Sequence, residues 1–265
     1  MYDKYFGLAD KPFRITPDTR YMWLSPQHTE AKLKILDHIQ ESSGPIYLSA
    51  DIGTGKTSIA KRIVEELVED KTKEIVYVFS PKLTTTNSFL RFIMDEFEVK
   101  THRAYGQSLR SFEEYLVKQN AEGISPVLLV DEAQNMTRDM LLLIQHLFNF
   151  STNTSFLVQM ALFAQPEFKK KLDRLPSLKS RMNVARLSPL TRDQTEEMLK
   201  FRWKVAGGES FPFNNEAVNQ IYKITDGIPR SIVRLADTAC LSAAINDKRM
   251  ITKDIIISAS SEVMD

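Results

Sequence analysis

A short apolar run that passes into a glycine-containing loop and then a helical pattern is the most constraining stretch of this chain. Residues 46–58 read IYLSADIGTGKTS, with Gly55, Lys56 and Thr57 at the start of the helical pattern. In a strand, loop and helix of this kind, successive backbone N–H groups point inward and cradle a phosphate, and the helix N-terminus adds the positive end of its dipole. The stretch therefore predicts a phosphate-binding P-loop.

The side chains of this loop have separate expected roles. We expect Lys56 to reach the β- and γ-phosphates of a nucleotide and the Thr57 hydroxyl to hold Mg²⁺. Ala50 departs from the pattern G-x-x-x-x-G-K-[ST], which has glycine there. Alanine fits such a turn if its φ stays negative, so a working loop is still expected. The loop residues predicted to bind the nucleotide are Asp51, Ile52, Gly53, Thr54, Gly55, Lys56, Thr57 and Ser58.

A pair of carboxylates follows another apolar run. Residues 126–130 lead directly into Asp131 and Glu132. Because the carboxyl ends of parallel strands meet at one edge of a sheet, we expect this pair beside the P-loop. Asp131 then holds Mg²⁺ through water, and Glu132 orients or deprotonates the water that attacks the γ-phosphate. The sequence thus predicts an ATPase that uses ATP and Mg²⁺, although two acids that cap the next loop are the alternative.

Four polar side chains further along the chain are additional candidates. Gln165, at the end of a predicted strand, can hydrogen-bond the γ-phosphate or the water, or can be an ordinary turn residue. Arg181 and Arg186 follow it, and the planar guanidinium suits the charge of a phosphate in the transition state. One of the two is expected to act in trans on the nucleotide of a neighbouring subunit. Arg230 is expected to reach the γ-phosphate and couple nucleotide state to the C-terminal helices; for each arginine, a solvated surface position is the alternative.

The order of apolar patterns predicts an α/β domain followed by helices. Strands alternate with helices and lack internal polar alternation, which indicates a parallel sheet covered on both faces. The first predicted strand is the apolar run that begins at residue 46 and leads into the P-loop, and the others are 75–79, 127–130 and 156–163. No strand pattern occurs after residue 187, and the predicted helices there are 192–206, 215–225, 229–246 and 253–262.

These patterns predict three parts of the chain. An aromatic, proline-containing arm at 1–24 is expected to pack on the core, because solvated tails rarely carry so many rings. An α/β nucleotide-binding domain is expected at 25–187, and a small all-α lid domain at 188–265.

Composition adds a few limits. The chain has 265 residues, of which 43% are hydrophobic, so a packed core is expected. The net charge of +1 neither requires nor excludes nucleic acid. Cys240, the single cysteine, is predicted to be a buried thiol, and the four histidines lack the spacing of a zinc site. There is no apolar run of about 18 residues and no secretory signal, so a cytoplasmic protein without membrane contact is expected.

Together these motifs resemble the AAA+ ATPases. The motifs, in chain order, are the P-loop, VLLVDE at 127–132, AQPE at 164–167, SRM at 180–182 and GIPR at 227–230. Residues 5–28, YFGLADKPFRITPDTRYMWLSPQH, resemble the N-terminus of the ExeA-like (general secretion protein A) ATPases. The resemblance covers nearly the whole chain, and it implies a P-loop AAA+ parallel sheet with a small α-helical lid.

The resemblance also implies roles for individual residues. These roles are the Walker B acids for Asp131 and Glu132, sensor 1 for Gln165, the arginine finger for Arg181, sensor 2 and nucleotide binding for Arg230, and the flank of the adenine for 25–28. Two positions, Ala50 and Ala164, differ from the glycine that is usual in the family. Neither difference removes a catalytic group.

The chain stops at the lid, whereas the secretion ATPases of the family continue into a membrane span and a peptidoglycan-binding domain. Lid-terminated relatives resemble transposition regulators of the TnsC, TniB and MuB type. This implies a homo-oligomer, as helical filaments or rings, with ATP at subunit interfaces, which forms on double-stranded DNA and links a target selector to a transposase. Phosphate contacts without base reading need basic or hydroxyl side chains. The candidates, expected on loops, are Lys82, Lys100, Thr101, Arg103 and Arg110, with solvated surface charge as the alternative for each.

Two other functions stay open on the sequence. An ATPase of a secretion or envelope assembly system would act on protein partners instead of DNA. A signalling or defence NTPase is the third interpretation.

Overall fold

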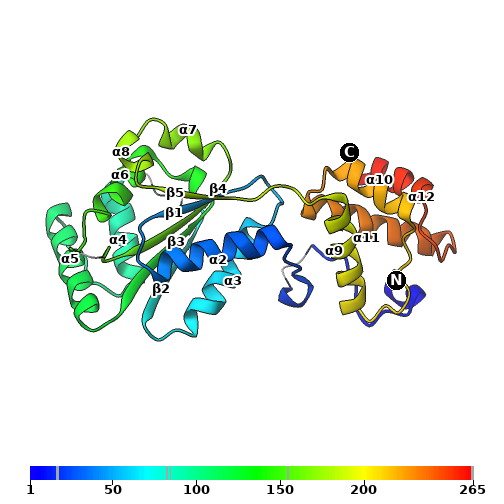
Figure 1. Ribbon diagram of the computed structural model, residues 1–265, viewed down its shortest axis with the longest axis horizontal. Helices are drawn as coiled ribbons and strands as arrows, with labels where there is room; N and C mark the ends of the chain where they lie inside the picture. The colour runs from blue at the N-terminus through cyan, green and yellow to red at the C-terminus, as the bar shows by residue number, and fades with distance from the viewer. Residues whose placement is uncertain (16–17, 82, 84, 154, 264–265) are drawn as a thin grey trace. The chain divides into compact units, whose positions relative to one another are not determined.

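The computed structural model describes residues 1–15, 18–81, 83, 85–153 and 155–263. The chain divides into two compact units. One, here called the α/β unit, comprises His28–Asp51 and Lys56–Leu187; the other, the helical unit, comprises Met1–Gln27, Ile52–Gly55 and Ser188–Asp265. Figure 1 labels the helices and strands of both, and each unit is described below by itself.

A parallel sheet forms the centre of the α/β unit. Among the described residues it has five strands in the order β2-β3-β4-β1-β5, and every neighbouring pair is parallel. The strands are β1 (Ile46–Ser49), β2 (Lys73–Phe79), β3 (Ser125–Asp131), β4 (Gln159–Ala164) and β5 (Asn183–Arg186). Along β3, Val127 and Leu129 join one hydrophobic cluster, whereas Leu128 and Val130 join another. The sheet is therefore buried on both faces, and the predicted α/β class is confirmed.

Two details of the predicted sheet are corrected. Strand β5 was not among the predicted strands; it pairs in parallel with β1 at the edge of the sheet. Its residues read NVAR, with Asn183 and Arg186 exposed, Val184 half-buried and Ala185 buried, so they form no apolar run. The predicted strand at 156–163 begins only at Gln159, because Phe156 forms an isolated antiparallel bridge with Ser151.

Helices cover both faces of this sheet (Figure 1). On one face, α2 (Pro26–Gln40) and α3 (Lys56–Val68) bury isoleucines in the cluster that contains Val127 and Leu129. On the other, α4, α5 and α6 pack in the cluster that contains Leu128 and Val130. Their bounds are Thr86–Glu96, Tyr105–Ala121 and Arg138–Leu147, and the short elements η2, α7 and α8 span Ala133–Asn135, Phe168–Leu172 and Pro176–Lys179.

The helical unit contains the four predicted C-terminal helices. They are α9 (Arg192–Val205), α10 (Asn215–Thr225), α11 (Pro229–Ile245) and α12 (Lys253–Val263), each within one residue of its predicted bounds. Local chemistry explains the agreement. The side chains of Thr191 and Asn214 accept hydrogen bonds from the first turns of α9 and α10, and Pro229 occupies the first position of α11.

The N-terminal arm packs on these helices within the helical unit, whereas the sequence pattern led us to expect it on the core. The arm contains α1 (Tyr2–Phe6) and η1 (Thr19–Tyr21). Phe13 is fully buried and stacks on Trp203 of α9, with 6.3 Å between the ring centroids. The aromatic rings of the arm pack against aromatic side chains of the helical unit, and the composition of the arm alone does not identify those partners.

Three smaller findings concern the cysteine, metal-ligating side chains and membrane-spanning helices. Cys240 is a buried free thiol, as predicted. Within the described part of the chain, no group of three or more metal-ligating side chains lies together. No helix in that same part has the length and apolar character that crossing a bilayer requires.

Candidate nucleotide-binding site

The loop between β1 and α3 contains two glycines with positive φ. Gly53 and Gly55 have φ values of 81° and 112°, a region that side chains with a Cβ avoid. Ala50 is not among the described residues with positive φ, so its methyl group causes no strain there. Its N–H donates to the carbonyl of Ala164 at 3.1 Å. The two alanines that replace the usual glycines are thus bonded to each other at the ends of adjacent strands.

Lys56 lies at the first position of α3 and is a buried residue, 5% exposed. Its Nζ donates to the carbonyls of Ala50, at 2.9 Å, and Asp51, at 3.1 Å. Burial lowers the pKa of this amine, and the nearby acids Glu132 and Asp131 act in the opposite direction. The ammonium group therefore sits against its own loop, at the place where a phosphate-binding lysine is needed.

The other loop residues differ in exposure. Asp51 and Ile52 are exposed, Thr54 is fully buried, and Ser58 is half-buried in the first turn of α3. The expected contribution of this stretch to a phosphate site is its backbone N–H groups, for which side-chain exposure matters little.

Asp131 is a fully buried carboxylate at the end of β3. Its Oδ2 accepts hydrogen bonds from Thr57 Oγ1 at 2.7 Å and from the Tyr77 hydroxyl at 3.0 Å, and its Oδ1 accepts from the N–H of Glu132 at 2.8 Å. The structure thus brings together the two residues predicted to hold the metal. A hydroxyl and a carboxylate are the hard oxygen ligands that Mg²⁺ prefers, so the donor set fits this ion.

Tyr77 is a further contact of Asp131 that was not predicted from the sequence. It comes from β2, next to β3 in the sheet, and burial together with the charge of Asp131 raises its pKa. The one signal in the sequence was a hydroxyl-bearing ring inside the otherwise apolar run IVYVF.

Glu132 has an unusual backbone conformation. Its φ and ψ are 53° and 39°, the left-handed region, which costs a residue with a Cβ about 1–2 kcal/mol. Such strain at a named residue is typical of functional sites. Its Oε2 accepts hydrogen bonds from the side-chain amides of Gln134 and, at 3.4 Å, Gln165. The structure therefore places the predicted base and the predicted sensor 1 residue in contact, at the ends of β3 and β4.

The predicted arginines lie in different surroundings. Arg181 is exposed, and its Nη1 donates to Asn149 Oδ1 at 2.9 Å. Arg186 is exposed at the end of β5, opposite Ser49 in register. Within the helical unit, the N–H of Arg230 donates to the carbonyl of Gly53 at 3.2 Å. In the α/β unit, neither Arg181 nor Arg186 is hydrogen-bonded to the acid pair.

The DNA candidates are scattered between a loop and a helix. Lys82 lies outside the described residues. Lys100 and Arg103 are exposed and Thr101 is half-buried, all between α4 and α5. Arg110 is exposed, but it lies within α5, so its predicted loop position is wrong. Ser108, in the first turn of α5, exchanges hydrogen bonds with the backbone of His102 and so ties the preceding loop to the helix.

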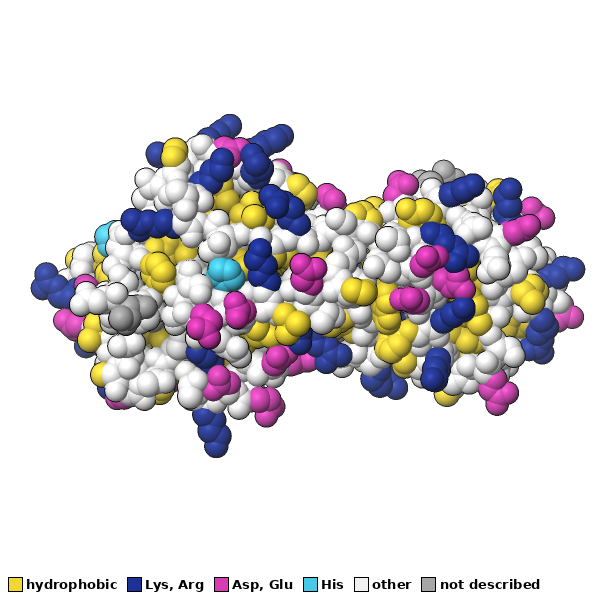
Figure 2. Space-filling view, in the orientation of Figure 1, with side chains coloured by type: hydrophobic (Ala, Val, Ile, Leu, Met, Phe, Trp, Pro, Cys, Tyr) yellow, Lys and Arg dark blue, Asp and Glu magenta, His cyan; other side chains and the backbone are white. Residues whose placement is uncertain are grey.

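A more basic surface lies on α7 and α8. Figure 2 shows Lys and Arg side chains gathered over these two helices at the top of the view. The exposed basic residues between Phe168 and Arg181 are Lys169, Lys170, Arg174, Lys179 and Arg181. Asp173 pairs with Lys169 at 3.0 Å and with Lys179 at 2.8 Å, which leaves the surface with a net positive charge.

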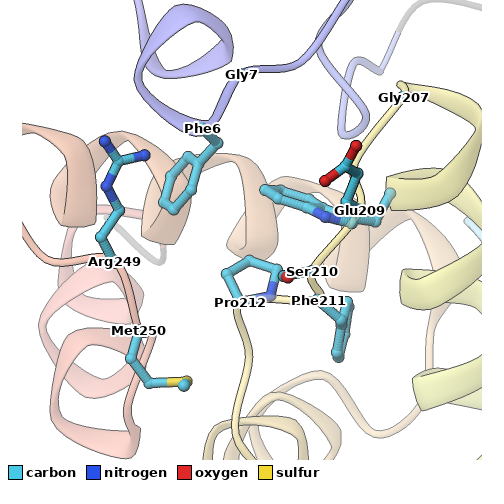
Figure 3. A pocket seen from close by; sticks show the side chains of 10 residues that line it. Phe6, Gly7, Gly207, Glu209, Ser210, Phe211, Pro212, Arg249 and Met250 are labelled. Carbon is cyan, nitrogen blue, oxygen red and sulfur yellow. The ribbon is translucent and has the colours of Figure 1, made fainter.

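The helical unit also contains a cavity of about 560 Å³. Figure 3 shows Phe6 and Pro212 beside it, with Arg249 and Glu209 on opposite sides of the view. The lining residues are Phe6, Gly7, Trp203, Gly207, Glu209, Ser210, Phe211, Pro212, Arg249 and Met250. None of the residues predicted to bind nucleotide is among them.

Comparison with known proteins places this site in a family. A family model described as an AAA domain matches residues 39–172. General secretion pathway protein A of Aeromonas hydrophila is 31% identical over 268 residues, which is 99% of this chain and 48% of that protein. The chain thus spans about half the length of this relative. The predicted similarity to the general secretion protein A ATPases is confirmed.

Solved structures agree on the fold. Cdc6p from Pyrobaculum aerophilum has a TM-score of 0.72 at 20% identity, over 97% of this chain and 72% of that chain. The Drosophila ORC bound to DNA has a TM-score of 0.69 at 18% identity, over 96% of this chain and 64% of that chain. Because the family model covers half of the chain and the surrounding fold is shared, the chain belongs to the AAA domain family of P-loop ATPases.

Proposed function

We propose that this chain is a Mg²⁺-dependent ATPase that assembles with itself on double-stranded DNA and regulates DNA transposition. The observation that carries the ATPase part is the 2.7 Å hydrogen bond between Thr57 and Asp131, with Glu132 as the next residue. It joins the P-loop, which follows β1, to the acid pair, which follows β3, with β4 between the two strands in the sheet. A bound Mg²⁺ ion would neutralise phosphate charge at that point.

Each predicted residue has a defined task in this proposal. The P-loop backbone and Lys56 bind the phosphates, and Thr57 and Asp131 hold Mg²⁺. Glu132 orients the attacking water or takes its proton. Gln165 fixes that carboxylate by its amide contact at 3.4 Å. Substitution of Glu132 by Gln should preserve ATP binding and lower kcat by about 10²–10⁴-fold, because only the base is lost; turnover at the wild-type rate would remove Glu132 from this role.

The proposed oligomer explains why Arg181 is exposed. A guanidinium that serves a neighbouring subunit must be on the surface of its own chain, and Arg181 is there with only Asn149 as its described hydrogen-bond partner. Arg186 is the alternative finger. Mixing a Glu132→Gln variant with an Arg181→Ala variant tests this directly. Recovery of turnover in the mixture supports action in trans, whereas strictly additive loss contradicts it.

The DNA part of the proposal rests on charge and on fold. The basic surface of α7 and α8 offers exposed Lys170 and Arg174, and the loop before α5 offers Lys100 and Arg103. A solved structure with this fold is described as bound to DNA. Contacts of this kind bind phosphates without reading bases, so affinity should fall steeply with salt.

The test is to follow ATP hydrolysis and assembly with and without duplex DNA. The proposal expects stimulation of ATPase activity and DNA-dependent filaments or rings. Replacing Lys170 and Arg174 together by Ala should reduce the salt slope of DNA binding by about two, one for each lost phosphate contact. Replacing Lys100 and Arg103 together by Ala is the matched comparison that identifies which surface binds DNA. ATPase activity that does not change when DNA is added would contradict the transposition role.

A secretion role is the second candidate. It is favoured by the 31% identity to General secretion pathway protein A, which extends over 99% of this chain. In that case ATP hydrolysis would respond to a protein partner and remain indifferent to duplex DNA. A third reading, a signalling or defence NTPase, has no specific observation in its favour.

A further inference from the structure

Gln134 is a nearly buried side chain that contacts two predicted catalytic residues. It is 8% exposed and lies in η2, two residues after Glu132. Its Nε2 donates to Glu132 Oε2, and its Oε1 accepts from the N–H of Gln165 at 3.1 Å. Because a backbone N–H can only donate, the amide oxygen must face Gln165. The amide nitrogen of Gln134 therefore has to face the carboxylate.

The two carboxylate oxygens of Glu132 differ in their hydrogen bonds. Gln165 Nε2 approaches the same Oε2 at 3.4 Å. Oε1 accepts no hydrogen bond from any residue that the structure describes. A carboxylate oxygen accepts hydrogen bonds, so Oε2 can take both amide donors. The arrangement commits Oε2 to the two amides and leaves Oε1 for water.

The backbone that carries Gln134 is itself held in place. The turn closes through a hydrogen bond from the N–H of Asn135 to the carbonyl of Glu132 at 2.9 Å. Lys171 of α7 donates from Nζ to the carbonyls of Gln134, at 2.6 Å, and Met136, at 2.7 Å. A side chain on a turn fixed from two sides can hold its neighbour in one orientation.

We propose that Gln134 is a positioning residue that orients the Glu132 carboxylate by linking it to the end of β4. The proposal deepens the proposed ATPase function and rests on it. Gln134 acts through Glu132 and need not touch the nucleotide. Misplacing a reacting group by about 1 Å can cost about 100-fold in rate, so losing this link should lower kcat by about 10- to 100-fold.

The experiment uses Gln134→Met, which keeps the volume of the side chain and removes its amide. The expected result is a lower kcat with the KM for ATP and the affinity for a non-hydrolysable ATP analogue nearly unchanged. Gln159→Met is the matched control, because Gln159 is 1% exposed and its amide donates to Phe156 instead of the acid pair. The control should keep the wild-type kcat.

A double variant separates positioning from general structural support. If Gln134 acts through Glu132, then adding Gln134→Met to Glu132→Gln should cause little further loss of kcat. A full additional loss would overturn the proposal, as would a wild-type kcat in Gln134→Met.

A second substitution, Gln134→Glu, tests the same contact if Gln134→Met fails to fold. Its carboxylate would repel Glu132, so kcat should fall. If neither variant folds, Gln134 is structural and the proposal is wrong. If wild-type protein hydrolyses no ATP at all, the proposed function fails, which is a distinct result.

Discussion

The contact between Arg202 and the N-terminal arm leads to a quantitative prediction. The guanidinium of Arg202, on α9, donates to the carbonyls of Pro12 at 2.8 Å, Tyr21 at 3.1 Å and Arg14 at 2.9 Å. It also lies over the ring of Tyr21, 5.4 Å from the centroid. Burial lowers the pKa of this guanidinium from its ordinary value.

The cost of Arg202→Ala follows from these contacts. A hydrogen bond to a charged group contributes about 1.5–3 kcal/mol, and the bond to Arg14 is exposed enough for water to replace it. Two bonds at the lower value give about 3 kcal/mol. That energy corresponds to a roughly 100-fold rise in the population of chains whose arm is detached from the helical unit.

Limited trypsin digestion measures this population. When detachment is fast relative to cleavage, the rate of cutting after Arg14 and Arg20 follows the detached fraction. We expect Arg202→Ala to be cut about 100-fold faster there. Arg202→Lys should recover only part of the protection, because an ammonium is a point donor and cannot span three carbonyls.

Arg234→Ala is the control, since Arg234 is an exposed arginine of α11. Its digestion pattern should match that of the wild type. Equal cleavage of the Arg202→Ala and Arg234→Ala proteins would refute the idea that Arg202 holds the arm.

Three further predictions follow from single residues. Lys56→Met should abolish nucleotide binding. Burial puts the folded pKa of Lys56 below its ordinary value of 10.5, so between those two values the unfolded wild-type protein binds more protons than the folded protein. Urea denaturation should therefore show that the stability of the wild type rises with pH in this range and that the stability of the variant does not. Gly227→Ala should lower the free energy of unfolding by about 3 kcal/mol, because its Cβ would lie 2.0 Å from the Leu190 carbonyl oxygen, whereas Gly123→Ala, with similar φ and open space, should show the smaller backbone cost alone. Cys240 is fully buried with a raised pKa, so a thiol reagent should react with it only after denaturant is added, and rapid labelling of native protein would contradict the buried position.

Features with a local cause were predictable from the sequence. The order of strand, loop and helix around Lys56 follows from apolar runs and glycines that are contiguous in the chain. The starts of α6, α9 and α10 follow from Thr137, Thr191 and Asn214, whose side chains cap the turn immediately after them. The pairing of Thr57 with Asp131 was also predictable, because parallel strands bring their carboxyl ends to one edge.

Features that depend on distant partners required the tertiary structure. The edge strand β5 has no apolar run, and only its pairing with β1 makes it a strand. The contacts of Tyr77 with Asp131 and of Gln134 with Glu132 depend on which strands are neighbours and on a left-handed residue in the turn.

By itself, the sequence of this protein determined a P-loop, an acid pair and the parallel α/β class, because hydrophobic periodicity, glycines and helix caps act over a few residues. Only the tertiary structure decided that the aromatic arm joins the C-terminal helices and that the Glu132 carboxylate is held by two amides. The physical reason is that side-chain burial and hydrogen bonding are satisfied by whatever partner the completed fold brings within reach, and that partner lies far away in the chain.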